Sequence, residues 1–185
     1  MEVKGTYIKA ISLFVKNNYP DMFYTWIKNL PDVSEKIHNN TILINQFYPL
    51  KEAASIPIYF ISKMFYNGNI ATAAKDVGRF HADFALKGVY KLFLILINPH
   101  LLVKSASKIY SKYYSESEYV ILYNKNKKAV SQIRNYPEKD IISETSMGAY
   151  TKRGLELAGA NNVTAKKTKS FARGDEVIEY VFEWE

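Results

Sequence analysis

The chain has 185 residues, 48% of them hydrophobic, and a formal net charge of +7. This length and composition suit one compact domain spanning residues 1–185, with enough apolar residues for a core of its own. The absence of cysteine excludes disulfides, thiolate metal sites and cysteine nucleophiles, and it favours a cytoplasmic location. No apolar run approaches the ~20 residues of a membrane-spanning helix, so no transmembrane segment is expected.

Residues 1–117 are predicted to form the helical part of the chain. Their apolar residues recur with helical spacing, and proline, glycine or asparagine marks the expected ends. The expected helices cover residues 7–15, 20–30, a short stretch from Ser34, and then 50–65, 70–87, 89–97 and 100–114. We expect Pro57 to kink the helix over 50–65 and Gly88 to cap the helix over 70–87.

Residues 118–185 change to the pattern of strands. Strands are predicted over 118–123, 129–134, 162–169 and 177–184, with a helix over 140–158 between the second and the third. The segment Asn-Lys-Asn-Lys-Lys at 124–128 has the composition of a hairpin turn. The sequence therefore predicts an α+β fold, in which an N-terminal helical layer packs on a C-terminal antiparallel ββαββ sheet.

The common motifs of catalytic and metal sites are missing from the sequence. No two of the three histidines have the i, i+4 spacing of a helical zinc site, and the G-x-S-x-G, G-x-x-x-x-G-K-[ST] and G-x-G-x-x-G patterns are absent. Asp76 and Asp83 lie two helical turns apart, but a pair of carboxylates alone has little specificity. We predict no metal ion, no cofactor and no enzyme activity.

A basic surface is predicted on the helix over 100–114. Lys104, Lys108 and Lys112 recur every four residues and therefore lie on one helical face. A solvated face is the simplest interpretation, and contact with an anionic partner, such as a membrane surface or nucleic acid, is the alternative. Nucleic acid is the less favoured partner because arginine clusters and glycine-flanked aromatic residues are absent.

The stretch GRFHADFALKGVYKLF, residues 78–93, places a histidine among large apolar residues. On a helix, one inward stripe is formed by Ala73, Val77, Phe80 and Phe84. His81 is one residue round from Phe80 and borders this stripe. Two interpretations follow: a boundary histidine with ordinary hydrogen bonds, or the polar group of an apolar ligand pocket.

Several segments, taken in order, resemble a known group of proteins. They are VKGTYIKAISLFV, YPLKEAASIPIYFI, GRFHADFALKGVYKLFLILINPHLLVKSASKIYSKYY, LELAGANNV and ARGDEVIEYVFEWE. The chain resembles a bacterial family related to haem-nitric-oxide-binding domains and to vinyl-reductase-type small-molecule sensors. These share the fold of TRAPP-type vesicle-tethering subunits. The resemblance implies a helical layer on a sheet that encloses an apolar ligand or docks another protein.

The chain departs from these relatives at the residues that bind haem and zinc. The resemblance implies a haem-binding histidine within the helix before the sheet, but residues 101–114 contain none. It also implies a Tyr-x-Ser-x-Arg motif, in which Ser117 replaces the arginine. Ser170 and Ile178 stand where zinc-binding relatives have cysteines. The sequence therefore predicts a domain that binds neither haem nor zinc.

The main hypothesis is a sensor module that binds an apolar or aromatic small molecule or a lipid. The predicted pocket wall consists of Phe80, His81, Phe84, Tyr90 and Phe93, with His81 and Tyr90 as its polar groups. The alternative is an adaptor without a ligand, which holds a protein partner through the lysine face or a sheet edge, or forms a homodimer. A cavity separates the two, because an adaptor is expected to fill its core at normal packing density.

Overall fold

The computed structural model describes residues 1–89 and 98–185. Its fold is α+β, as the sequence predicts: helices come first and an antiparallel sheet follows. The strand, strand, helix, strand, strand order predicted for residues 118–185 is confirmed. Of the helix predicted over 89–97, residues 90–97 lie outside the described part of the chain.

The N-terminal part is helical, as expected from its apolar spacing. It contains the helices α1 (Gly5–Asn18), α2 (Phe23–Asn29), α3 (Asp32–Asn39), α4 (Ile56–Phe65) and α5 (Ile70–Phe84). It also contains a two-stranded sheet that the sequence did not predict, formed by β1 (Glu2–Lys4) and β2 (Phe47–Pro49). Strands of three residues are too short for an alternating pattern to identify them.

Both predicted interruptions of helices lie in or beside π-helical turns, and the predicted cap at Gly88 is wrong. Pro57 is in the first turn of α4, directly after the π-helical turn Lys51–Ser55, within a helical run that continues over residues 50–65. Gly88 lies inside a second π-helical turn, Ala85–Val89, which follows α5. Gly88 lacks the positive φ of a helix-capping glycine. The chain therefore continues from α5 into a wider helical turn, and Gly88 does not cap the helix.

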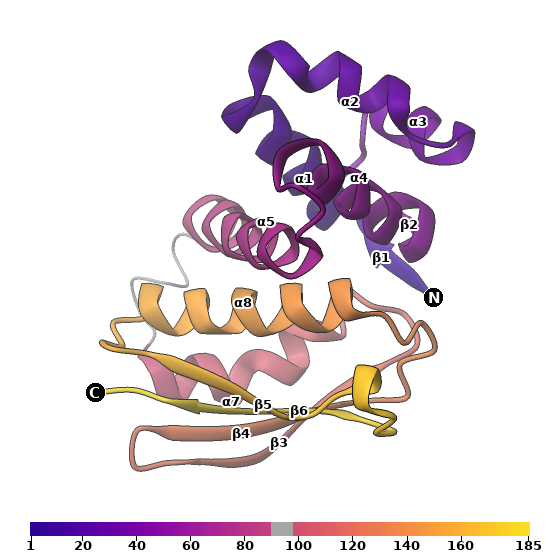
Figure 1. Cartoon of the computed structure of the whole chain (residues 1–185). Coiled ribbons are helices and arrows are strands. Elements are labelled where there is room, and N and C mark those ends of the chain that lie inside the picture. The colour runs from indigo at the N-terminus through magenta and orange to yellow at the C-terminus, as the bar shows by residue number, and fades with distance from the viewer. Residues whose placement is uncertain (90–97) are drawn as a thin grey trace.

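The C-terminal part forms a four-stranded antiparallel sheet in the order β3-β4-β6-β5. Its elements are α7 (Pro99–Tyr110), β3 (Glu118–Lys125), β4 (Lys128–Arg134), α8 (Ile141–Leu157), β5 (Thr164–Lys169) and β6 (Ile178–Glu183). Asn126 and Lys127 both have positive φ, of 50° and 55°, which is the geometry of a tight two-residue hairpin. Figure 1 shows α7 and α8 against the sheet, with α8 between the sheet and α5.

Helices α5 and α8 approach closely at a glycine. A Cβ atom built on Gly78 would lie 2.3 Å from the carbonyl oxygen of Ser146 and 2.9 Å from its Cα atom. Because both atoms belong to the backbone of α8, a change of side-chain rotamer cannot make room. Gly78 therefore sets how near α5 lies to the helix that covers the sheet.

We expect Gly78→Ala to lower the free energy of unfolding by about 1–3 kcal/mol, the cost of forcing extra volume into a packed interface. Chemical denaturation measures this change. Gly88→Ala is the matched control, because a Cβ atom there meets no atom of the described residues within 4 Å. Equal stabilities of the two variants would contradict the close approach of α5 and α8.

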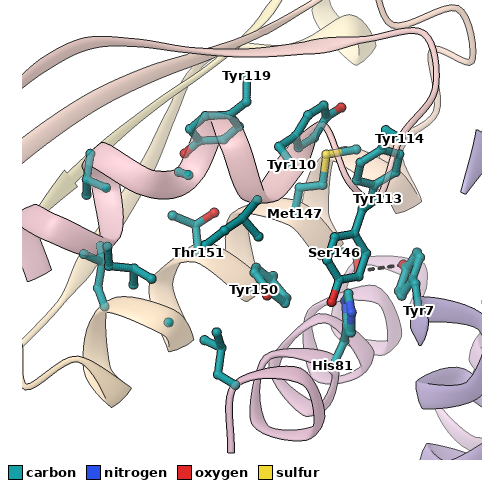
Figure 2. A pocket seen from close by; sticks show the side chains of 17 residues that line it. Tyr7, His81, Tyr110, Tyr113, Tyr114, Tyr119, Ser146, Met147, Tyr150 and Thr151 are labelled. Atoms are coloured by element: carbon teal, nitrogen blue, oxygen red, sulfur yellow. Dashed lines mark hydrogen bonds between the residues drawn. The ribbon is translucent and has the colours of Figure 1, made fainter. Parts of the chain in front are cut away.

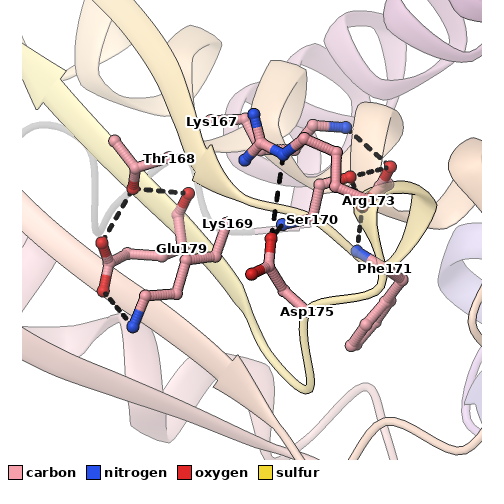
Figure 3. A network of polar contacts seen from close by, with 9 residues as sticks. Lys167, Thr168, Lys169, Ser170, Phe171, Arg173, Asp175 and Glu179 are labelled. Atoms are coloured by element: carbon pink, nitrogen blue, oxygen red, sulfur yellow. Dashed lines mark hydrogen bonds and ion pairs between the residues drawn. The ribbon is translucent and has the colours of Figure 1, made fainter.

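A buried carboxylate ties α8 to the turn between β5 and β6. Glu144 is fully buried, and its carboxylate accepts hydrogen bonds from Lys167 Nζ at 2.7 Å and from Ser170 Oγ at 2.9 Å. The Phe171 backbone N–H also donates to it, at 3.2 Å. Figure 3 shows the strand and turn residues that surround it, including Asp175, which accepts from the Ser170 backbone N–H at 2.7 Å. Each oxygen of the buried carboxylate is thus satisfied.

Across the described residues, no helix has both the length and the apolar character to cross a membrane.

Candidate ligand-binding site

A pocket of about 90 Å³ lies where α5, α7 and α8 meet. Helices α7 and α8 supply most of its wall (Figure 2). Residues from α1, α5, β3, the π-helical turn after α5 and the turn after α7 contribute the rest of the described lining. The lining residues with aromatic rings or polar side chains are Tyr7, His81, Tyr110, Tyr113, Tyr114, Tyr119, Ser146, Tyr150 and Thr151. The others are Leu86, Leu102, Val103, Ala106, Ile109, Met147, Gly154 and Leu155. None of these described lining residues carries a formal charge at neutral pH.

His81 lies within a cage of tyrosine rings. The ring of Tyr7 stacks on the imidazole at 4.6 Å between centroids, and that of Tyr150 lies 4.7 Å away. The Tyr113 ring meets it edge-on at 5.6 Å. Burial lowers the pKa of His81 to about 3, so the imidazole is neutral at physiological pH. Its Nε2 atom is buried and has no hydrogen-bond partner among the described residues.

Four hydroxyls of the wall are paired within the protein. The hydroxyls of Tyr7 and Ser146 are 3.0 Å apart, Tyr110 pairs with Ser117 at 2.6 Å, and Tyr119 donates to Ser131 at 2.8 Å. Burial raises the pKa of Tyr7, Tyr110 and Tyr119 further above the ordinary value of a phenol. These tyrosines are therefore neutral, and they give the wall its bulk.

Of the three predicted pocket residues that the structure describes, one lies at this site. His81 lines it, whereas Phe80 packs its ring edge-on against Phe14, 5.6 Å away on α1. Phe84 is half-buried and is not part of the lining. Tyr90 and Phe93 lie outside the described residues.

The three lysines of the predicted basic surface are exposed. Lys104 and Lys108 belong to α7, but the predicted helix over 100–114 ends early, at Tyr110, so Lys112 lies beyond it. Two of the three predicted lysines, Lys104 and Lys108, therefore lie on the helix, and Lys112 lies in the turn that follows it.

Sequence reasoning missed the pocket residues that α8 contributes. On α8, six lining residues follow helical spacing: Ser146, Met147, Tyr150, Thr151, Gly154 and Leu155. This stripe was visible in the sequence as one face of the helix predicted over 140–158. The sequence could not say that this face meets α7 and His81, because that contact joins segments distant in the chain.

The positions that the resemblance assigns to haem or zinc binding make other contacts in this chain. Tyr113 and Tyr114 line the pocket, and Ser117 bonds to the Tyr110 hydroxyl. Ser170 bonds to the buried Glu144, and Ile178 is fully buried in the core. Within the described residues, no three His, Cys, Asp or Glu side chains come together as a metal site.

Comparison with known proteins reveals similarity of structure but not of sequence. No protein-family model matches the chain, and no curated protein does. An H-NOX protein from S. oneidensis, solved in the Fe(II) ligation state, superposes with a TM-score of 0.77 over 98% of this chain and 96% of its own, at 10% identity. An H-NOX protein from K. algicida gives a TM-score of 0.69 over 98% and 96%, at 12% identity.

A third match is the H-NOX domain of Shewanella oneidensis in the Fe(II)CO state, with a TM-score of 0.74 over 98% of each chain and 12% identity. Sequence identities this low, together with the superpositions, show a shared fold but not a shared function. The resemblance predicted from the sequence is thus confirmed for the haem-nitric-oxide-binding branch as a fold, while kinship with vinyl-reductase-type sensors and TRAPP-type subunits stays a prediction. The chain has the fold of H-NOX domains over nearly its whole length.

Proposed function

We propose that this chain is a non-enzymatic sensor domain that binds a small apolar molecule, without haem, in the pocket between α5, α7 and α8. One observation carries the proposal: the aromatic pocket of about 90 Å³ lies inside a fold that H-NOX proteins share. Cavities of this order accept small apolar guests, since an engineered one of about 150 Å³ binds benzene or xenon. An adaptor with a filled core is the less supported alternative.

The donor atoms around the pocket argue against haem. Similar structures were solved in Fe(II), Fe(II)NO and Fe(II)CO states. Along α7 the residues that line the pocket are aliphatic apart from Tyr110, and aliphatic side chains have no atom that binds iron. The helix's one histidine, His100, stands at its start, where Nδ1 bonds to Asn124 at 2.6 Å.

The volume of the pocket and the charge of its described lining also argue against haem. His81 offers one imidazole nitrogen to iron, but the described lining holds no lysine or arginine to pair with the propionate carboxylates of haem. A haem has four pyrrole rings, each of nearly the size of benzene, and the pocket is smaller than the cavity of about 150 Å³ that holds a single benzene. The residues present do not fit the group.

The protonation states of the pocket support a binding role and not a catalytic one. A general acid or base works best with a pKa near the working pH. Burial instead holds the pKa of His81 at about 3 and raises the pKa of Tyr7 above its ordinary value. Neither group exchanges its proton readily at neutral pH, so the pocket holds a molecule without transforming it.

Two titrations test the proposal on the whole chain. We expect xenon to shift the ¹³C methyl resonance of Met147, which lines the pocket, and to leave that of Met64 on α4 in place. Ala106→Leu, which fills the pocket, is expected to abolish the shift. Haemin is expected to give no stoichiometric Soret band. A one-to-one Soret band that disappears in His81→Leu, or a Met147 resonance that ignores xenon, would contradict the proposal.

A further inference from the structure

A polar atom at the pocket wall, Nε2 of His81, has no hydrogen-bond partner among the described residues. The Nε2 atom of His81 is buried, and the imidazole lies at the pocket wall beside Tyr113 and Ser146 (Figure 2). A buried polar group without a hydrogen bond destabilises the fold, so such atoms in folded proteins call for an explanation. The neighbouring hydroxyls of Tyr7 and Ser146 do not supply the bond, because they pair with each other at 3.0 Å.

We propose that Nε2 of His81 is the hydrogen-bonding anchor of the pocket and that it selects small neutral molecules carrying a hydroxyl group. This inference rests on the proposed function, since it requires that the pocket hold a ligand. The apolar residues around it, Leu102, Ala106 and Met147, would contact the hydrocarbon part of the same molecule.

A hydroxyl group suits this site better than other polar groups. A neutral imidazole nitrogen either donates or accepts, depending on the tautomer. A hydroxyl can accept from Nε2–H or donate to a bare Nε2, so it satisfies both forms, whereas an ether or a carbonyl oxygen satisfies only the first. Because no described residue bonds to Nε2 of His81, a ligand hydroxyl can form a hydrogen bond there without displacing another partner.

Charged molecules are excluded by the same wall. The described lining contains no lysine, arginine, aspartate or glutamate, so neither a carboxylate nor an ammonium would meet an opposite charge. Desolvating an ion without a partner is far more costly than desolvating a hydroxyl. The imidazole cannot supply the missing charge either, because burial keeps the pKa of His81 at about 3.

A series of four-carbon probes tests the anchor. 1-Butanol and 1-chlorobutane have similar shapes but differ in the hydroxyl, while butyrate and butylammonium carry charges. Binding is followed through the Met147 methyl resonance, with Met64 as the internal reference. The quantity compared is the ratio of the chlorobutane Kd to the butanol Kd, which cancels differences in protein stability.

In His81→Leu we expect this ratio to fall about tenfold from its wild-type value, the effect of one lost hydrogen bond in a buried site. His38→Gln is the matched control, because this second buried histidine is not part of the pocket lining, and we expect its ratio to stay near that of the wild type. Neither charged probe is expected to bind. An unchanged ratio in His81→Leu would overturn the anchor while leaving the pocket intact.

A measurement without substitutions guards against a variant that fails to fold. In the wild-type protein, butanol is expected to shift the ¹⁵N resonance of His81 Nε2 and chlorobutane to leave it in place. Equal effects of the two probes would overturn the anchor. If neither butanol nor chlorobutane moves Met147, the proposed function fails, and the anchor fails with it.

Discussion

Acidification from pH 7 to pH 4.5 is expected to lower the free energy of unfolding by about 5 kcal/mol through two buried histidines. Burial lowers the pKa of His38 to about 4 and that of His81 to about 3. In the unfolded chain both have a pKa near 6.5. The folded state therefore binds fewer protons than the unfolded state, and stability is complete above pH 6.5 and falls as the pH decreases towards the folded values.

Burial is the main reason that His38 resists protonation, because it penalises the charged imidazolium, and the hydrogen bond to the Ala53 carbonyl, which raises the pKa, offsets only part of this effect. Its Nε2 atom lies 2.9 Å from the Ala53 carbonyl oxygen and can only donate to it, so Nε2 carries the proton. Nδ1 then accepts from the Ser12 hydroxyl at 2.7 Å. A second proton on Nδ1 would remove this acceptor inside the core. His81 faces only neutral aromatic rings, from Tyr7, Tyr113 and Tyr150, so no counter-charge there stabilises its protonated form.

Urea unfolding at closely spaced pH values checks this expectation. Between pH 6.5 and pH 4.5 each histidine should contribute an average slope of about 1.1 kcal/mol per pH unit. His38→Gln and His81→Leu should each remove one such contribution, whereas the carboxylates titrate alike in all three proteins. Identical slopes in the wild type and both variants would mean that these histidines are protonated in the folded state.

Glu144→Ala is expected to lower the free energy of unfolding by about 3–5 kcal/mol, the usual cost of removing one partner from a buried ion pair. The side chain of Glu144 is fully buried, and that of Lys167 is 27% exposed. Without the carboxylate, the hydroxyl of Ser170 and the backbone N–H of Phe171 lose their acceptor. Thermal and chemical unfolding both report this loss.

Glu35→Ala is the control for charge alone. Glu35 also forms a short ion pair, with Lys28 Nζ at 2.6 Å, but the lysine side chain is 70% exposed. Pairs of this kind contribute little because water solvates both partners, so we expect almost no change in stability. Comparable losses in the two variants would indicate that Glu144 is accessible to water.

The order of the elements was predictable from the sequence because it depends on local patterns. Helical spacing and strand alternation separate the two parts of the chain, and the hairpin composition of residues 124–128 corresponds to the turn at Asn126 and Lys127. The end of α5 was not predictable in the same way. A glycine after a helix usually signals a cap, and only the three-dimensional structure reveals that Gly88 lies within a wider helical turn.

The pocket was harder to predict because α5 is covered on more than one side. Phe80 faces α1, Gly78 faces α8, and His81 faces the pocket, so a single inward stripe does not describe this helix. The stripe chosen from the sequence followed the two phenylalanines. His81 was identified because a histidine at the edge of an apolar stripe is unusual, but its aromatic partners come from distant segments of the chain, such as that of Tyr150.

The sheet ends on both sides in strands with irregular pairing. The register shifts between Ile121 and Tyr123 in β3 and between Lys167 and Lys169 in β5, whereas the central pair β4 and β6 is regular. Bulges and lysines at an edge hinder the addition of a further strand, and β5 has both. Self-association by strand exchange and growth into fibrils through this sheet are therefore disfavoured, even in a chain with so many aromatic residues.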